Sequence, residues 1–183
     1  MKRTLKNKTI VGLIITLLVI IFSIIMLESC NDSTLPTDAV KMTVSQVSAT
    51  PGFEWFAPRL AEYIPDTNII SQIKTVFDTS KYKFYIYCKP SCSCEESQKV
   101  FPRIMKVLME AGVPESRYEI FSMAKPTYFH PYKNKFFVNS IPATFTSNTN
   151  DSFYSIVDTI DAIKVRYPDS VYTVEKIILY SLK

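Results

Sequence analysis

Three cysteines lie close together in the stretch YKFYIYCKPSCSCEESQKVFPRI, residues 82–104. Cys88 and Cys92 form a C-x-x-x-C pair, and Cys92 and Cys94 form a C-x-C pair. Thiolates attack disulfides and bind soft metal ions such as Cu(I), and in oxidising compartments cysteines persist as structural disulfides. The cluster is therefore a redox centre, a metal site or a structural disulfide joining Cys88 to Cys92 or Cys94, and the compartment bears on the choice.

The first 30 residues have the pattern of a targeting segment. Four basic residues precede an uncharged run at 10–27; they are Lys2, Arg3, Lys6 and Lys8. A transmembrane helix needs about 17 to 25 apolar residues, and basic residues before it stay in the cytoplasm. Residues 1–30 are thus predicted to be a signal peptide or a signal anchor. The rest of the chain is then extracytoplasmic, on the periplasmic or cell-surface side of a bacterium.

Leu27-Glu28-Ser29-Cys30 resembles a bacterial lipobox, in which the cysteine is lipidated. Under that interpretation Cys30 carries the lipid, and a retained membrane helix is the alternative because Glu28 departs from the pattern. Residues 31–50 are rich in Ser, Thr, Asp and Val without helical periodicity and are interpreted as a polar tether. Residues 51–183 are predicted to be the folded domain, anchored to the membrane through the segment before it.

The net charge of +4 arises mostly from the targeting segment. Without its four basic residues and Glu28, the 21 basic and 17 acidic residues fall to 17 and 16. A nucleic-acid surface needs clustered Lys and Arg, so no nucleic-acid partner is expected. With 47% hydrophobic and 13% aromatic residues, the chain can bury a substantial core.

The cysteines lie between a predicted strand and a predicted helix. KFYIY, residues 83–87, is a short apolar run typical of a buried strand. Helical spacing then places Val100, Ile104, Val107 and Leu108 on one apolar stripe. Gly112 and Pro114 end the helix, and RYEIFSM, residues 117–123, is the next strand. A strand–helix–strand unit of this size predicts a parallel pair with a right-handed crossover.

The other expected elements flank this unit. A short helix is predicted at 53–64, extended by residues 68–77 into a helical cap, and helices are predicted around residues 156–167 and at 171–182. Two more strands are predicted at 136–138 and 143–146, separated by Asn139-Ser140-Ile141-Pro142. The sequence thus predicts an α/β domain.

The order of elements, the cysteines at the strand-to-helix junction and Ile141-Pro142 before a later strand resemble the thioredoxin-like superfamily over roughly residues 75–170. The resemblance implies a central mixed sheet flanked by helices, with a cis bond before Pro142 against the active sulfur. Pro102 lies eight positions after Cys94, which matches the kinking proline of the family and assigns Cys94 the place of the nucleophile. Ser93 and Glu96 have the spacing of a capping box that would begin the helix at Cys94.

The cysteine site departs from the family pattern. Ser97 stands where the second cysteine of C-x-x-C is expected, Ser93 replaces a tryptophan, and Cys88 replaces a buried acid. A cysteine at a helix N-terminus is stabilised as thiolate. The predicted activity is thiol–disulfide exchange with exported proteins, without a cofactor. In this activity Cys94, or Cys92 if the helix starts earlier, attacks a partner disulfide, and a neighbouring cysteine resolves the mixed disulfide. Cys88 is the inert or the resolving thiol, and Ser97 hydrogen-bonds the thiolate.

Two alternatives remain open. C-x-x-x-C at the end of a strand also resembles the Sco-type copper chaperones, which are themselves thioredoxin-like. That resemblance implies copper held by Cys88, Cys92 and His130, the one histidine of the chain. The other alternative is a thioredoxin-like binding module that has lost catalysis, because Ser97 replaces a cysteine.

Overall fold

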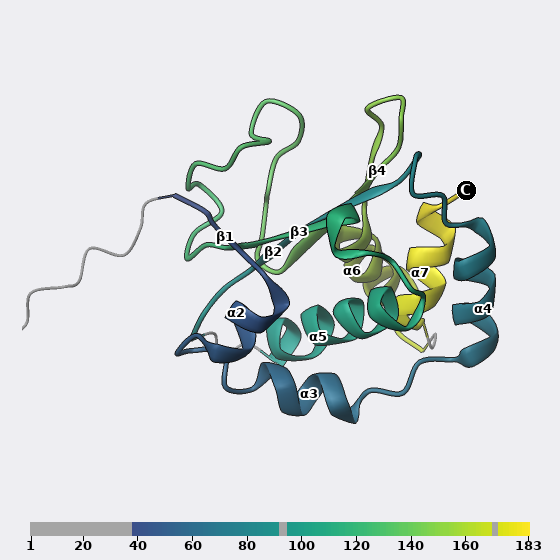
Figure 1. Ribbon diagram of the computed structural model, residues 1–183, viewed down its shortest axis with the longest axis horizontal. Coiled ribbons are helices and arrows are strands. Elements are labelled where there is room, and N and C mark those ends of the chain that lie inside the picture. Colours follow the sequence, from purple (N-terminus) through teal and green to yellow (C-terminus); the bar gives the residue numbers. More distant parts are fainter. Residues whose placement is uncertain (1–37, 92–94, 170–171) are drawn as a thin grey trace, which may run out of the picture. The chain divides into compact units, whose positions relative to one another are not determined.

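The computed structural model describes residues 38–91, 95–169 and 172–183, which form an α/β domain with a mixed five-stranded sheet and flanking helices (Figure 1). The strands are β1 (Val40–Met42), β2 (Lys83–Cys88), β3 (Tyr118–Ser122), β4 (Ala143–Ser147) and β5 (Phe153–Ser155). The helices are α2 (Val44–Ala49), α3 (Phe56–Glu62), α4 (Thr67–Val76), α5 (Glu95–Glu110), α6 (Ile156–Arg166) and α7 (Val174–Ser181), with a 3₁₀ turn at Glu115–Arg117.

Strand β2 is central in the sheet, whose order is β1-β3-β2-β4-β5. It runs parallel to β3 and antiparallel to β4, while β1 and β5 are antiparallel edge strands. The predicted parallel pair joined through a helix is confirmed, with α5 as the connection. A central strand has neighbours on both sides and is covered on both faces, which explains its continuous apolar run.

Residues of β2 alternate between two hydrophobic clusters on opposite faces of the sheet. Phe84, Ile86 and Cys88 belong to a large cluster that contains the buried residues of the helices. Tyr85 and Tyr87 belong to a smaller aromatic cluster, in which residues of the 123–142 segment cover the sheet. In the described part of the chain, no helix contributes to this second cluster.

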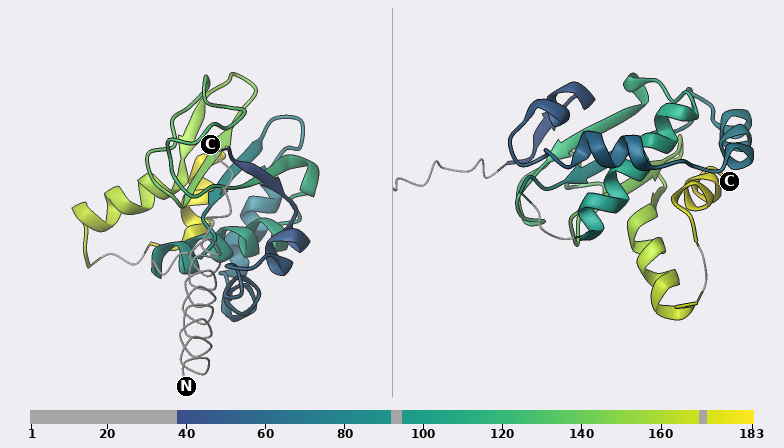
Figure 2. Two further views of the ribbon diagram at one scale, coloured as in Figure 1. Left: turned by 90° about the vertical axis from the view of Figure 1, so that its left-hand side faces the viewer. Right: turned by 90° about the horizontal axis from the view of Figure 1, so that it is seen from below.

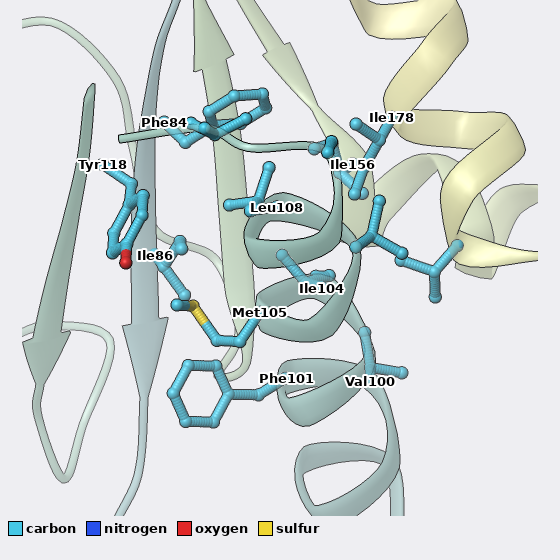
Figure 3. Packing of buried hydrophobic residues seen from close by; sticks show 14 of the residues in the cluster. Phe84, Ile86, Val100, Phe101, Ile104, Met105, Leu108, Tyr118, Ile156 and Ile178 are labelled. Carbon is cyan, nitrogen blue, oxygen red and sulfur yellow. The ribbon is translucent and has the colours of Figure 1, made fainter. Parts of the chain in front are cut away.

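Helix α5 packs its apolar stripe against β2 and β3. Val100, Ile104, Val107 and Leu108, the stripe predicted from spacing, are all buried. Figure 3 shows Phe101, Met105 and Leu108 directed toward the strands that carry Phe84, Ile86 and Tyr118. Gly112 follows the helix with φ of 73°, the left-handed conformation that ends helices.

The N-terminal part of the domain begins earlier than the sequence indicated. Residues 40–42 and 44–49, assigned to the tether, form β1 and α2, and Asp38 forms a bridge with Phe129. Thr43 and Gln46 form a capping box at the start of α2. In the ranges described, no helix is long and apolar enough to cross a membrane. The predicted signal or anchor segment, with Cys30, lies outside them.

The predicted strand at 136–138 is wrong. Phe136 and Val138 are buried in the aromatic cluster and Phe137 is exposed, but these residues pair with no strand. β4 follows as predicted, and it pairs with β2 on one side and with β5 on the other. The predicted helices are confirmed with shifted ends: α3 and α4 are separate helices, and α7 begins at Val174.

Candidate functional site

One end of the sheet gathers the residues that the sequence singled out. Cys88 ends β2 and pairs with Ser122, the last residue of the parallel strand β3. Tyr87 pairs with Ala143 in antiparallel β4, so Pro142, one residue earlier, lies at the same end as Cys88. This is the carboxyl end of the central parallel strands, where α/β proteins commonly place their sites.

Cys88 is a buried free thiol in this structure. Its side chain is fully buried, and its Sγ donates a hydrogen bond to the backbone oxygen of Phe121 over 3.6 Å. Burial raises the pKa of Cys88 far above that of an ordinary thiol. The thiolate is the reactive form of cysteine, so Cys88 is a poor nucleophile.

The other two cysteines, Cys92 and Cys94, lie outside the described residues, as does the predicted cap Ser93. Helix α5 begins at Glu95, one residue after Cys94. Ser97 is fully buried near the start of this helix, and Pro102 lies inside it, as the sequence indicated. The chain therefore leaves β2 at Cys88 and enters α5 immediately after Cys94.

Pro142 lies at the same end of the sheet, just before β4, on the side of β2 that is opposite to β3. The Ile141–Pro142 bond is cis, as the resemblance implied, and Pro142 is buried. The described chain also enters the sheet here, because Val40 of β1 pairs with Ser122. Cys88, Pro142 and the start of β1 thus surround the end of the sheet from which the cysteine segment departs.

One glycine, which was not singled out from the sequence, contacts the backbone at the beginning of the cysteine segment. Gly52, between α2 and α3, has φ of 91°, and its carbonyl oxygen accepts a hydrogen bond from the backbone N–H of Ser91 over 2.8 Å. Ser91 is itself in the left-handed region, with φ of 51°. Trp55 donates its indole N–H to the same carbonyl over 3.0 Å. The chain has three glycines, and their scarcity is the sequence signal that could have pointed to Gly52.

Gly52→Ala is expected to destabilise the fold by roughly 1–3 kcal/mol and to slow any reaction of the cysteine segment. A Cβ at this position would lie 2.6 Å from Ser91 Oγ and 2.8 Å from Ser91 N, in addition to the positive φ. Gly112→Ala is the matched control, because its φ is also positive but nothing lies within 4 Å of the added carbon. Denaturant unfolding of both variants measures the difference, and equal losses would contradict a close approach at Gly52.

His130 is a buried member of the aromatic cluster. It is 2% exposed, its Nδ1 lies 3.0 Å from the hydroxyl of Tyr87, and its ring stacks on Phe136 with centroids 5.6 Å apart. Because Tyr87 and Cys88 are consecutive in β2, their side chains are on opposite faces, and the structure does not bring His130 to Cys88. Among the described residues no group of three metal-ligating side chains is present. The copper alternative stays a prediction, since Cys92 lies outside them.

The stability of the domain is expected to fall as the pH is lowered from about 7 to 5. Burial, with a smaller contribution from Lys133, lowers the pKa of His130 below its usual value near 6.5. Between the folded and unfolded pKa values the unfolded state binds more protons, so acidification favours unfolding in this window. Denaturant titrations across this range should show less pH dependence for His130→Gln than for the unchanged chain. The same pH dependence of stability in both proteins would contradict the assignment of this effect to His130.

A polar cluster that was not predicted from the sequence lies around Glu119 of β3 and connects neighbouring strands of the sheet. Its carboxylate pairs with Lys83, with Lys41 at 3.0 Å, and accepts a hydrogen bond from Tyr132 at 2.8 Å. Burial alone would raise the pKa of Glu119, but these three donors outweigh it and the pKa is lowered. The cluster joins β1, β2, β3 and the covering loop, and we assign it a structural role.

Comparisons with protein-family models, curated proteins and solved structures found no match.

Proposed function

We propose that the chain is a membrane-tethered, extracytoplasmic thioredoxin-like domain that exchanges thiols and disulfides with exported proteins. The observation that supports this best is the arrangement at the carboxyl end of β2. There Cys88 and Pro142 lie at one sheet end, and the C-S-C segment connects that end to the start of α5. The strand order around β2 supports the same proposal.

The three cysteines have different roles in this proposal. Cys94 is assigned as the nucleophile because α5 begins at the next residue, and partial positive charge at a helix N-terminus stabilises a thiolate. Cys92 is assigned as the resolving thiol. Cys88 is assigned as the inert member, because its sulfur is fully buried and its pKa is raised.

The reaction begins when the Cys94 thiolate attacks one sulfur of a partner disulfide. A mixed disulfide forms and the partner's other sulfur leaves as a thiolate, which takes up a proton. Cys92 then loses its proton and attacks Cys94, which releases the second partner thiol. The partner is reduced by two electrons, and the domain carries a Cys92–Cys94 disulfide until a thiol reductant restores it. The reverse sequence oxidises a partner dithiol.

The described chain begins at the same end of the sheet as the proposed site, because Val40 of β1 pairs with Ser122. With the N-terminal segment anchored by a helix or by lipid on Cys30, the domain would remain near the membrane surface and act on exported proteins that come close to it.

Trapping of the mixed disulfide tests the proposal. The full chain, solubilised in a non-ionic detergent, is mixed with a disulfide-bonded secreted protein, quenched with acid, alkylated and separated without reductant. Cys92→Ser should accumulate a covalent complex through Cys94, because the resolving thiol is missing, whereas Cys94→Ser should form none. Absence of a complex with every variant would contradict exchange and favour the non-catalytic binding module.

A further inference from the structure

A polar cleft lies beside the start of α5, between this helix and α3. Its volume is about 460 Å³, and it is lined by Arg59, Glu62, Tyr63, Gln98, Lys99 and Arg103. Figures 1 and 2 show α3 running alongside α5, and Phe56 stacks on Phe101 between them. Among the described lining residues, three are cationic and one is anionic.

The position of Arg103 in this cleft is supported by a chain of contacts that ends at the buried Glu175. Its guanidinium lies over the ring of Tyr63, 5.0 Å from the centroid. The Tyr63 hydroxyl donates to Glu175 over 2.5 Å, and Glu175, which is 2% exposed, also accepts the backbone N–H of Asp66 over 3.1 Å. Stacking uses the face of a guanidinium and leaves its N–H edge able to bind an oxyanion.

The other two cations are placed along the cleft. Arg59 pairs with Glu62 over 2.9 Å, but both side chains are substantially exposed, and such a pair exchanges partners at little cost. Lys99 precedes Arg103 by four residues, one turn of α5, which is about 6 Å along the helix axis. In an extended peptide, alternate residues are about 6.6 Å apart on the same side. Two carboxylates at alternate positions therefore match the spacing of Lys99 and Arg103.

We propose that this cleft binds an extended acidic segment of the partner protein, with carboxylates at alternate positions directed at Lys99 and Arg103. The inference rests on the proposed function for the identity of the partner. Gln98 and Lys99 lie in the first turns of α5, the helix that the chain enters after the cysteine segment, so a segment bound here would lie close to the start of that helix. The cleft would then select disulfides that have acidic residues nearby.

The test measures binding of a fluorescent, cysteine-free peptide with aspartate at two alternate positions to the full chain in non-ionic detergent. At about 50 mM salt the peptide should bind, and its analogue with asparagine at both positions should bind at least about five-fold more weakly. Arg103→Gln and Lys99→Gln should each weaken binding about five-fold, and about 300 mM salt should weaken it further.

Arg166→Gln is the matched control, because Arg166 also lies over a tyrosine ring, that of Tyr167, on the distant helix α6. It should leave the affinity unchanged. Equal binding of the two peptides, an equal loss in Arg166→Gln, or competition by inorganic phosphate at the peptide's own concentration would each overturn the proposal. Since the peptide has no cysteine, peptide binding without mixed-disulfide trapping would refute exchange alone, and trapping without binding would refute the cleft alone.

Discussion

Replacement of Cys94 by serine is expected to lower the rate of disulfide exchange by roughly 1,000-fold or more, while the fold is retained. A serine hydroxyl is not ionised near neutral pH and does not attack disulfides, whereas a thiolate at the start of a helix does. Cys94 immediately precedes α5, so this substitution removes the atom on which the proposed reaction depends. The reduction rate of a disulfide-bonded protein substrate in the presence of a thiol reductant measures the effect.

Cys88→Ala provides the control for the Cys94 experiment. Cys88 is fully buried and its sulfur makes one weak hydrogen bond, so its removal should lower stability modestly and leave the exchange rate within a few-fold of the unchanged chain. The assignment would be reversed if Cys88→Ala abolished exchange while Cys94→Ser retained it.

Phe101→Ala is expected to lower the free energy of unfolding by about 3–5 kcal/mol. The Phe101 side chain is fully buried on α5 and stacks on Phe56 with ring centroids 4.9 Å apart. It also meets Trp55 edge-on at 6.3 Å, which joins α5 to the Gly52 turn. Because domains of this size are stable by only about 5–15 kcal/mol, this loss should be evident in chemical denaturation.

Met109→Ala is the comparison on the same helix, because Met109 is 46% exposed. Its cost should be within about 0.5 kcal/mol, the usual range for surface positions. Similar losses in the two variants would mean that Phe101 is not the packing centre between α3 and α5. A far-ultraviolet spectrum of each variant before denaturation checks that the helices are still formed.

The central elements were predictable because burial leaves a clear pattern in the sequence. The apolar run of β2 and the i, i+4, i+7 stripe of α5 each have a single arrangement that buries them. The edge strands β1 and β5 are three residues long, and none of their residues is fully buried, so they carry almost no pattern. Phe136 and Val138 show the opposite case, in which a strand-like alternation of burial arises in a loop without a pairing partner.

The order of the candidate residues along the fold was predictable, but their environment was not. Spacing placed Cys88, Pro102 and Pro142 correctly relative to the strands and α5. The sequence does not reveal that Gly52 would contact Ser91, because the two are brought together by the packing of α3 against α5. The burial of His130 against Tyr87 likewise depends on how the 123–142 loop folds over the sheet.

The most direct measurement is a redox titration of the full chain across a series of glutathione poises, with thiols trapped by alkylation and mapped by mass spectrometry. The account predicts one pair, Cys92 with Cys94, that titrates in the range of known exchange proteins, roughly −120 to −270 mV, while Cys88 stays a thiol throughout. A pair that includes Cys88, or a pair that stays oxidised at every poise, would contradict the account. Three thiols that never pair would contradict it as well and would direct attention to copper.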